Sequence, residues 1–337
     1  MKILVTGGAG YIGAHSVVEL ISAGYDPVVV DNLSASDLTL IQGIEKITGK
    51  QVVFYQGDCR DRLFLSDVFA KENISAVIHF AALKSVGESV EKPLEYYDNN
   101  VGSLLVLLDA IRRHRVTDFI FSSSCTVYGQ PDSIPVTEET PFKKAESPYG
   151  ATKQMCERIL EDVAKTGLRV ISLRYFNPIG AHPSAYIGEL PRGVPNNLVP
   201  FVTQTAAGLR QELVVFGNDY NTPDGSCIRD FIHVVDVAGA HVDALRYLQQ
   251  KSEPVLYEAF NLGIGKGMSV LEIVSLFERV TGVSLRYRIG SRRLGDVEKI
   301  YADPSRIMNQ LNWKPKFTIE QALLHAWQWQ KKLSGLS

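Results

Sequence analysis

TGGAGYIG, residues 6–13, decides the fold, because it joins the first strand-like run of the chain to the first helical pattern. Gly7, Gly10 and Gly13 recur at every third position of this stretch. Glycines at that spacing allow a tight turn and let backbone amides approach a pyrophosphate, to which the helix amino terminus adds a partial positive charge. The glycines alone would also suit a tight turn without a ligand, but the strand–turn–helix context favours a dinucleotide-binding turn.

Strand-like and helix-like segments alternate through the first half of the sequence. The strand-like runs are short and rich in Val, Ile and Phe, which suits strands buried on both faces of a parallel sheet. They are Lys2–Thr6, Pro27–Asp31, Val52–Tyr55, Ala76–Phe80, Asp118–Ser123 and Arg169–Arg174. The helical patterns between them are Tyr11–Ala23, Asp37–Ile47, Asp61–Glu72, Asn99–His114 and Tyr149–Thr166. This alternation predicts the α/β class: a doubly wound parallel sheet of the Rossmann kind, with right-handed crossovers and helices on both faces.

The amino-acid composition of the sequence changes after Asn177. Residues 177–230 are rich in Gly, Pro and Asn, and long loops of this kind in a compact protein are usually functional or mobile. Helical patterns resume at Val235–Gln250, Ser269–Thr281 and Thr318–Lys331. We therefore expect a dinucleotide-binding Rossmann domain at residues 1–175 and a smaller, loop-rich substrate-binding lobe at 176–337, some segments of which return to the sheet.

Composition and charge argue against several other classes of protein. The 337 residues are 45% hydrophobic and 21% charged, as in an ordinary globular protein with a large core. A net charge of -2 offers no electrostatic case for a nucleic-acid partner or an anionic membrane surface. The four cysteines lie far apart without a CxxC pair, so we expect no metal site, no disulfides and a cytoplasmic location. We also expect no signal peptide and no membrane span, because the chain starts directly with a strand and lacks a long apolar run.

Asp31, at the end of the second expected strand, bears on the choice of dinucleotide. A carboxylate there can accept a hydrogen bond from an adenosine ribose hydroxyl and would repel a 2′-phosphate. Asn32 and Leu33 follow it and supply no arginine to offset that repulsion, so NAD is favoured over NADP. Asp58, after the third expected strand, is placed to face the adenine edge. Both aspartates would also suit plain loop positions.

A second pattern, SPYGATK at residues 147–153, places Tyr149 and Lys153 on one face of an expected helix. A lysine ammonium nearby, together with a cationic nicotinamide ring, favours the phenolate, which makes Tyr149 a candidate general base for a sugar or alcohol hydroxyl. The strand end at residues 122–124 carries three serines where a parallel sheet presents its ligands, so Ser124 is a candidate for binding the same hydroxyl. A helix-surface pair and strand-end capping are the alternative interpretations.

Together these motifs resemble the extended short-chain dehydrogenases/reductases, and more closely the UDP-glucose (UDP-galactose) 4-epimerases of that family. The resemblance covers essentially the whole chain. Besides the glycine turn and the Y-x-x-x-K pair, it rests on the strings FAALKSVGESVEKPLEYYDNN, LRYFNPIGAHPS, NNLVPF, FGNDYNTPDGSCIRDFIHV, FNLGIGKGMSV and RRLGDV. It implies a UDP-sugar substrate, a tightly held NAD that is reduced and reoxidised within one turnover, and a homodimer formed through the helices near 90–114 and 149–166.

Site residues follow from the resemblance, motif by motif. The catalytic set would be Ser124, Tyr149 and Lys153. The residues implied to bind NAD are Gly7, Gly10, Tyr11, Ile12, Gly13, Asp31, Asn32, Asp58, Cys59, Phe80, Ala81, Ala82, Lys84, Asn99, Ser122, Tyr149, Lys153 and Tyr175. Those implied to bind the UDP-sugar are Lys84, Ser124, Phe176, Asn177, Asn197, Leu198, Phe216, Arg229, Arg293, Asp296 and Ile300.

The chemistry of the carried-over residues suits these roles. Arg229 and Arg293 can clamp a diphosphate with charge-assisted hydrogen bonds, although isolated arginines are more often surface charges. Asp296 can accept from uridine ribose hydroxyls. Two positions depart from the family pattern. Ile300 stands where the family varies between a bulky Tyr and a small Cys, which leaves acceptance of N-acetylated sugars open, and Phe231 stands where a Tyr is common.

The sequence argues, to different degrees, against three alternative functions. A nucleotide-sugar 4,6-dehydratase needs extra acid and base groups, and the string Ser124-Cys125-Thr126 carries no carboxylate where such enzymes resemble T-D-E. A net dehydrogenase would consume NAD stoichiometrically, which the sequence excludes less firmly. A non-catalytic NAD sensor would be expected to lose Ser124, Tyr149 or Lys153, and all three are present. A 4-epimerase of UDP-hexoses is therefore favoured, with UDP-GlcNAc/UDP-GalNAc or UDP-pentose epimerisation as the alternative.

Overall fold

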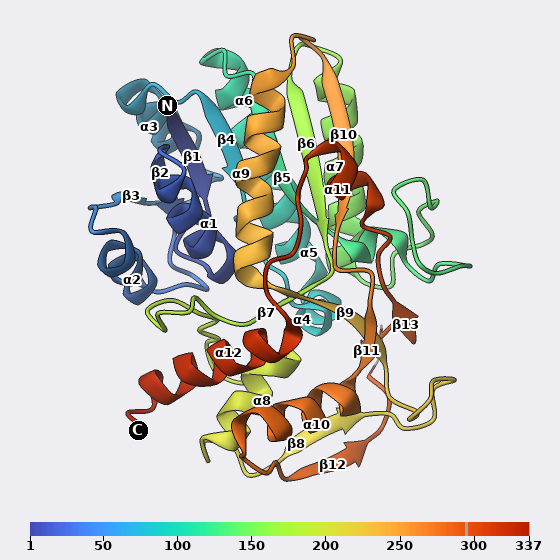
Figure 1. The fold of residues 1–337 in the computed structure, drawn as a ribbon. Coiled ribbons are helices and arrows are strands. Elements are labelled where there is room, and N and C mark those ends of the chain that lie inside the picture. The colour runs from blue at the N-terminus through green and yellow to red at the C-terminus, as the bar shows by residue number, and fades with distance from the viewer. Residues whose placement is uncertain (294–295, 337) are drawn as a thin grey trace.

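A seven-stranded parallel sheet forms the centre of the molecule, in a computed structural model that describes residues 1–293 and 296–336 (Figure 1). Its strand order is β10-β6-β5-β4-β1-β2-β3, so the chain starts in the middle and winds outward in both directions. The strands are β1 (Lys2–Thr6), β2 (Asp26–Asp31), β3 (Val53–Gln56), β4 (Ala76–His79), β5 (Asp118–Ser124), β6 (Arg169–Tyr175) and β10 (Leu256–Leu262). This arrangement confirms the doubly wound α/β fold predicted from the sequence.

Helices cover both faces of the sheet because successive residues of each strand point to opposite sides. Ile3 and Val5 of β1 pack in one apolar cluster with α1 (Tyr11–Ser22), α2 (Leu38–Thr48) and α9 (Val234–Gln250). Leu4, between them, packs in a second cluster with α3 (Arg62–Glu72), α6 (Ser103–Arg113) and α7 (Pro148–Ala164). The core therefore consists of two apolar layers separated by the sheet.

One helical segment differs from the sequence prediction. The helix expected at Asn99–His114 is preceded by α4 (Val86–Glu91) and α5 (Pro93–Tyr96), and a π-helical turn at Tyr97–Gly102 leads into α6. The Ser85 side chain caps α4 by accepting from the Glu88 amide at 3.3 Å, and Pro93 occupies the first turn of α5. These are ordinary start signals, but apolar periodicity does not register helices of four to six residues.

The C-terminal half divides between this sheet and a separate lobe. α9 and β10 belong to the large sheet layer, where β10 pairs with β6. The lobe contains a second sheet of β7 (Asn177–Ile179), β9 (Ile228–His233), β11 (Gly267–Ser269) and β13 (Lys299–Ile300), and a pair formed by β8 (Leu213–Phe216) and β12 (Tyr287–Gly290). Around them lie α8 (Leu198–Ala206), α10 (Val270–Thr281) and α12 (Ile319–Leu333), whereas α11 (Ser305–Gln310) packs on the large sheet beside β10. The division at residue 175 stays a prediction.

Within residues 1–293 and 296–336, no helix combines the length and the apolar character needed to cross a membrane.

Candidate active site

A cavity of about 520 Å³ opens at the carboxyl ends of β1, β2 and β4, between the large sheet and the segment 189–197. In a doubly wound sheet this edge is where ligands bind, because the loops that follow neighbouring strands converge there. Every residue predicted to bind NAD borders this cavity: Gly7, Gly10, Tyr11, Ile12, Gly13, Asp31, Asn32, Asp58, Cys59, Phe80, Ala81, Ala82, Lys84, Asn99, Ser122, Tyr149, Lys153 and Tyr175. The fold therefore brings all of these residues together around one cavity.

The glycine turn leaves no room for side chains. A Cβ on Gly13 would lie 2.2 Å from the carbonyl oxygen of Gly7, and a Cβ on Gly7 would lie 2.7 Å from the backbone nitrogen of Ala81. Gly7 also has a φ of +72°, which glycine adopts without strain. The close approach of the turn to β4 and the amino terminus of α1 forms a cradle of backbone groups that suits a diphosphate.

The Asp31 carboxylate organises the loops on either side of the turn. It is 8% exposed and accepts hydrogen bonds from the Ala9 amide at 3.1 Å, the Leu33 amide at 2.9 Å and the Ser36 hydroxyl at 2.7 Å. A negative charge fixed at this position would repel a 2′-phosphate. Nearby, hydrogen bonds from Arg60 lower the pKa of Asp58 to about 2, so Asp58 is also ionised at neutral pH. The pair supports the choice of NAD over NADP.

Tyr149 and Lys153 lie on the first two turns of α7, facing β5. Pro148 opens the helix, and the Ser147 hydroxyl accepts from the Gly150 amide at 3.2 Å, so the helix begins just before Tyr149. The Lys153 ammonium donates to the Ser122 carbonyl oxygen at 2.6 Å and lies 5.8 Å from the centroid of the Tyr149 ring. The predicted pair thus shares one face of the helix, with Lys153 buried and Tyr149 half-buried.

Burial affects the protonation of both members of this pair. Burial raises the pKa of Tyr149 to about 12, against a partial lowering by a hydrogen bond with Ser124. Burial also lowers the pKa of Lys153 to about 8. The chain's own groups therefore favour the neutral phenol, because the phenolate loses more hydration than its neighbours restore. A phenolate at Tyr149 requires further positive charge in the cavity.

The residues predicted to flank the sugar lie beside the carboxyl end of β5. Ser124 is 9% exposed and accepts from the Thr126 amide at 3.2 Å. Phe176 and Ile300 share a small apolar cluster with the start of the 3₁₀ turn at Cys125–Tyr128. The side-chain oxygen of Asn177 is buried and has no hydrogen-bond partner among the described residues. These residues do not border the large cavity.

A third group comes from the C-terminal lobe and contains the residues predicted to hold UDP. Asp296 lies between Arg293, with a nitrogen–oxygen distance of 2.8 Å, and Arg229, with one of 3.7 Å. The Arg293 guanidinium lies 5.7 Å from the centroid of the Phe216 ring. Ile300 pairs with Arg229 in the register of β13 and β9, which joins this group to the apolar cluster. Asn197 borders the large cavity, and Leu198 begins α8 and packs into the core of the lobe.

The segment 189–197 was missed by sequence reasoning except for Asn197. The Glu189 carboxylate accepts from the Lys84 ammonium at 3.0 Å and from the side-chain amide of Asn197 at 2.6 Å. Arg192 donates to the carbonyl oxygens of Ser34 at 3.0 Å and Ser36 at 2.6 Å, so the segment is tied across the cavity to the loop after β2. Its Gly- and Pro-rich composition indicated a functional loop, but no local pattern indicated what it would contact.

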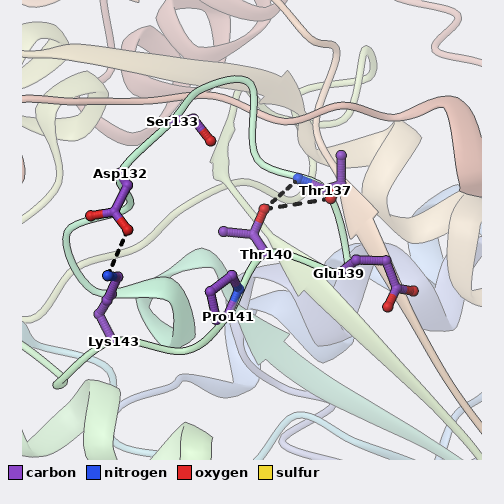
Figure 2. A pocket seen from close by; sticks show the side chains of 7 residues that line it. All are labelled: Asp132, Ser133, Thr137, Glu139, Thr140, Pro141 and Lys143. Atoms are coloured by element: carbon purple, nitrogen blue, oxygen red, sulfur yellow. Dashed lines mark hydrogen bonds and ion pairs between the residues drawn. The ribbon is translucent and has the colours of Figure 1, made fainter.

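A second, smaller hollow of about 270 Å³ lies in the loop between β5 and α7 (Figure 2). It is lined by Asp132, Ser133, Thr137, Glu139, Thr140, Pro141 and Lys143, with an ion pair of 2.6 Å between Lys143 and Asp132. None of the predicted site residues lines it, so the large cavity is the candidate site.

Comparison with known proteins places the chain in a family. The family model described as GDP-mannose 4,6 dehydratase matches residues 4–325. The chain is 51% identical over 331 residues to the UDP-glucose 4-epimerase of Dictyostelium discoideum, covering 98% of this chain and 95% of that protein. It is 49% identical over 332 residues to the UDP-glucose 4-epimerase of Bacillus subtilis, covering 98% and 97%.

Solved structures agree with these relatives. A UDP-glucose 4-epimerase from Stenotrophomonas maltophila with bound NAD and formylated UDP-arabinopyranose superposes with a TM-score of 0.96 at 47% identity, covering 99% of both chains. The UDP-glucose 4-epimerase of Bifidobacterium longum in complex with NAD+ and UDP has a TM-score of 0.95 at 46% identity, covering 98% of both chains. Sequence and fold therefore agree over nearly the whole length, and the chain belongs to the UDP-glucose 4-epimerase family of extended short-chain dehydrogenases/reductases.

Proposed function

We propose that this protein interconverts UDP-galactose and UDP-glucose by reversible hydride transfer at C4 of the sugar, using a tightly held NAD. The observation that carries the proposal is the cavity at the sheet edge, which joins a glycine cradle and Asp31 at one end to Tyr149 and Lys153 at the other. The cradle excludes any side chain, and the Asp31 carboxylate suits a ribose hydroxyl, so these residues fit NAD. The chemistry that bound NAD supplies is reversible acceptance of the C4 hydride.

In this mechanism Tyr149 holds and moves the proton of the sugar 4-hydroxyl. The half-buried phenol borders the cavity, and the side chain of Ser124 partly lowers its pKa and would bind the same sugar hydroxyl. Lys153 lies beside the phenol and its charge opposes the effect of burial. Loss of the hydroxyl proton to Tyr149, together with loss of the C4 hydride, would leave a 4-keto sugar, and return of the hydride to C4 with the proton from Tyr149 would complete either epimer.

Inversion requires the sugar to turn while its nucleotide stays bound. We assign the anchoring role to the lobe at 176–337, where Arg229 and Arg293 flank Asp296. Two guanidinium groups can hold a diphosphate by charge-assisted hydrogen bonds. Binding energy from the remote UDP then positions a carbon that the anchor does not touch, while the hexose is free to present its other face.

The dehydratase alternative is disfavoured by the residues that follow β5, although the family model carries a dehydratase description. The turn after β5 reads Cys125-Thr126-Val127-Tyr128, without a carboxylate to remove a proton from C5. The test is incubation of the purified protein with UDP-galactose and separation of the products. Formation of UDP-glucose without net NADH supports the proposal, stoichiometric NADH indicates a dehydrogenase, and a keto-deoxy sugar indicates a dehydratase.

The range of sugars is a finer part of the proposal, and Ile300 is the residue that bears on it. Ile300 is 4% exposed and packs in the cluster that contains Phe176, so its side chain limits the space beside the predicted sugar position. Its size lies between those of Cys and Tyr, which leaves UDP-GalNAc and UDP-pentoses as alternative substrates. Parallel incubations with UDP-galactose, UDP-GalNAc and a UDP-pentose rank the three.

We also propose a cytoplasmic homodimer. Leu94 is 80% exposed, and Leu105 of α6 and Met155 of α7 are each 48% exposed, which leaves apolar surface on the helices predicted to form the interface. Leu105→Glu combined with Met155→Glu should convert a dimer into a monomer, as measured by light scattering after size-exclusion chromatography. The four cysteines are all buried and unpaired, which supports a reducing compartment, and fractionation of producing cells tests it.

A further inference from the structure

The helix that carries Tyr149 and Lys153 has a third ionisable residue on the same face. Glu157 follows Lys153 by four positions, as Lys153 follows Tyr149, so the three side chains lie one above another along α7. Tyr149 and Lys153 border the large cavity, whereas Glu157 lies one turn deeper and is 2% exposed. A carboxylate so deeply buried needs a structural or chemical reason, because burial of an unpaired charge is strongly unfavourable.

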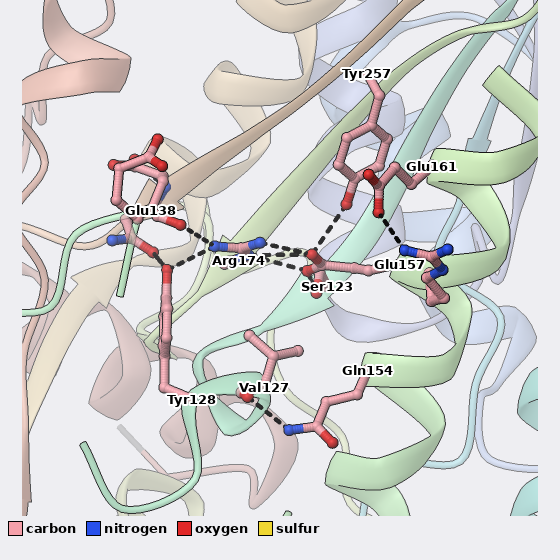
Figure 3. A network of polar contacts seen from close by, with 12 residues as sticks. Ser123, Val127, Tyr128, Glu138, Gln154, Glu157, Glu161, Arg174 and Tyr257 are labelled. Carbon is pink, nitrogen blue, oxygen red and sulfur yellow. Dashed lines mark hydrogen bonds and ion pairs between the residues drawn. The ribbon is translucent and has the colours of Figure 1, made fainter. Parts of the chain in front are cut away.

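Glu157 is the centre of a polar network that joins the strands behind the site (Figure 3). Arg174 of β6 contacts both of its carboxylate oxygens, with distances of 3.0 Å from Nε to Oε1 and 2.7 Å from Nη2 to Oε2. Ser123 of β5 donates its hydroxyl to Oε1, and Tyr257 of β10 donates to Oε2 at 3.0 Å. One carboxylate thus holds α7 against three neighbouring strands.

Arg174 is fixed from its other side as well. Its Nη1 donates to the Tyr128 hydroxyl at 2.9 Å and to the Glu138 carbonyl oxygen at 3.1 Å. The Tyr128 hydroxyl donates in turn to Asn261 at 2.6 Å. The guanidinium therefore has no freedom to turn away from Glu157, and the pair is as rigid as the sheet to which it is attached.

The network contacts the proposed catalytic groups through adjacent residues. Ser123, which donates to Glu157, lies between Ser122, whose carbonyl oxygen accepts from Lys153, and Ser124, whose side chain partly lowers the pKa of Tyr149. Glu157 also acts on Lys153 through its charge: burial lowers the pKa of Lys153, and Cys156 and then Glu157 oppose that lowering. The other titratable groups facing Lys153 are Tyr149 and Cys156 on α7 and His79 on β4, and those facing Glu157 are Arg174, Tyr128, Tyr257 and Cys156.

We propose that Glu157, clamped by Arg174, is a positioning residue for the epimerisation, which seats α7 on β5 and stabilises the charged form of Lys153 beside Tyr149. The inference rests on the proposed function, since it assigns to Lys153 a role in proton transfer at Tyr149. It extends the Tyr149 and Lys153 pair to a row of three residues whose last member touches neither cofactor nor sugar.

The first test compares two glutamate variants of the same helix. Glu157→Gln removes the buried charge, whereas Glu161→Gln removes a charge one turn further along, where Glu161 forms an exposed ion pair with Arg158 at 3.4 Å. We expect Glu157→Gln to move the alkaline limb of the kcat profile for UDP-galactose downward by about one pH unit, the lower end of the shift that a close opposite charge produces. Glu161→Gln should leave both the limb and kcat unchanged.

Additional variants separate this effect from a loss of folded protein. Glu157→Gln leaves Arg174 buried without its partner, which destabilises the fold. The double variant Glu157→Gln/Arg174→Gln removes both charges, so stability should recover while the alkaline limb stays displaced. Glu157→Asp keeps the charge, so the limb should return to the wild-type position even where kcat is reduced by the shorter side chain.

A direct titration completes the test without relying on turnover. The Lys153 ammonium is followed by nitrogen NMR of labelled lysines, with Lys153→Met to assign the signal. A lowered titration midpoint in Glu157→Gln and in the double variant supports the inference, and a midpoint equal to that of the wild type overturns it. Absence of UDP-glucose formation by the wild type would refute the proposed function alone, because the Lys153 midpoint is read independently of activity.

Discussion

Tyr149 tests the proposed chemistry at the scale of a single residue. Tyr149→Phe removes one oxygen from a buried ring, so the fold is kept and the proton carrier is lost. We expect turnover of UDP-galactose to fall by roughly a hundredfold or more, the scale of a positioned general base. Tyr25→Phe, which removes an exposed hydroxyl bonded to Gln249, is the matched control and should keep full activity. Turnover near the wild-type value in Tyr149→Phe would remove this residue from the mechanism.

Ile300 provides a second residue-scale prediction, which concerns specificity. Ile300→Gly opens space beside Phe176 in the apolar cluster at the inner end of the site. We expect kcat/KM for UDP-GalNAc to rise relative to that for UDP-galactose, because an N-acetyl group needs that space. The measurement is the ratio of the two kcat/KM values in the variant and the wild type. An unchanged ratio would show that another residue limits the sugar.

The segment 189–197 carries a prediction at the scale of an element. Arg192 ties this segment across the cavity to the Ser34 and Ser36 carbonyl oxygens, and so closes the side on which the adenosine half would lie. Arg192→Ala should therefore speed the release of bound NAD by about tenfold or more, since each lost hydrogen bond from a charged donor is worth about 1.5 kcal/mol. Cofactor retained after gel filtration measures the effect, and Arg246→Ala, in an exposed ion pair, is the control. Equal retention in both variants would argue that the segment does not hold the cofactor in place.

Four buried histidines should lower the stability of the whole molecule as the pH falls. Burial lowers the pKa of His15, His79 and His233 to about 3 and that of His241 to about 4. Below pH 6.5 these histidines bind protons in the unfolded chain but stay neutral in the folded chain. The free energy of unfolding that is present above pH 6.5 is therefore lost as the pH falls toward 3. The loss is about 1.4 kcal/mol per pH unit for each such histidine.

The measurement is the free energy of unfolding by urea between pH 7 and pH 4. We expect the free energy of unfolding to decline steeply as the pH falls. The decline should be shallower in His15→Gln, because His15 has a buried ring nitrogen with no partner among the described residues. The same slope in the wild type and in His15→Gln would show that His15 does not contribute.

The sequence by itself determined the elements whose chemistry is local. The glycine turn, the strands buried on both faces, and the start of α7 at Ser147 and Pro148 each follow from interactions within a few residues, and the structure has them where they were predicted. The family followed from the combination of motifs, because so many strings rarely occur together in one order by chance. The short helices α4 and α5 before α6 were not predicted, because four to six residues are too few to establish a helical period of apolar residues.

Only the tertiary structure decided what lies between distant parts of the chain. Arg192 meets Ser34 across 158 positions, and Arg174 meets Glu157 between a strand and a helix that local patterns treat separately. The effect of burial on Tyr149 was likewise beyond the sequence: the sequence suggested that the neighbouring lysine and a cationic nicotinamide ring favour the phenolate, and only the structure shows that burial raises the pKa of the phenol to about 12. Hydration and long-range contacts depend on which surfaces the fold brings together, whereas turns, caps and strand patterns depend on neighbours in the chain.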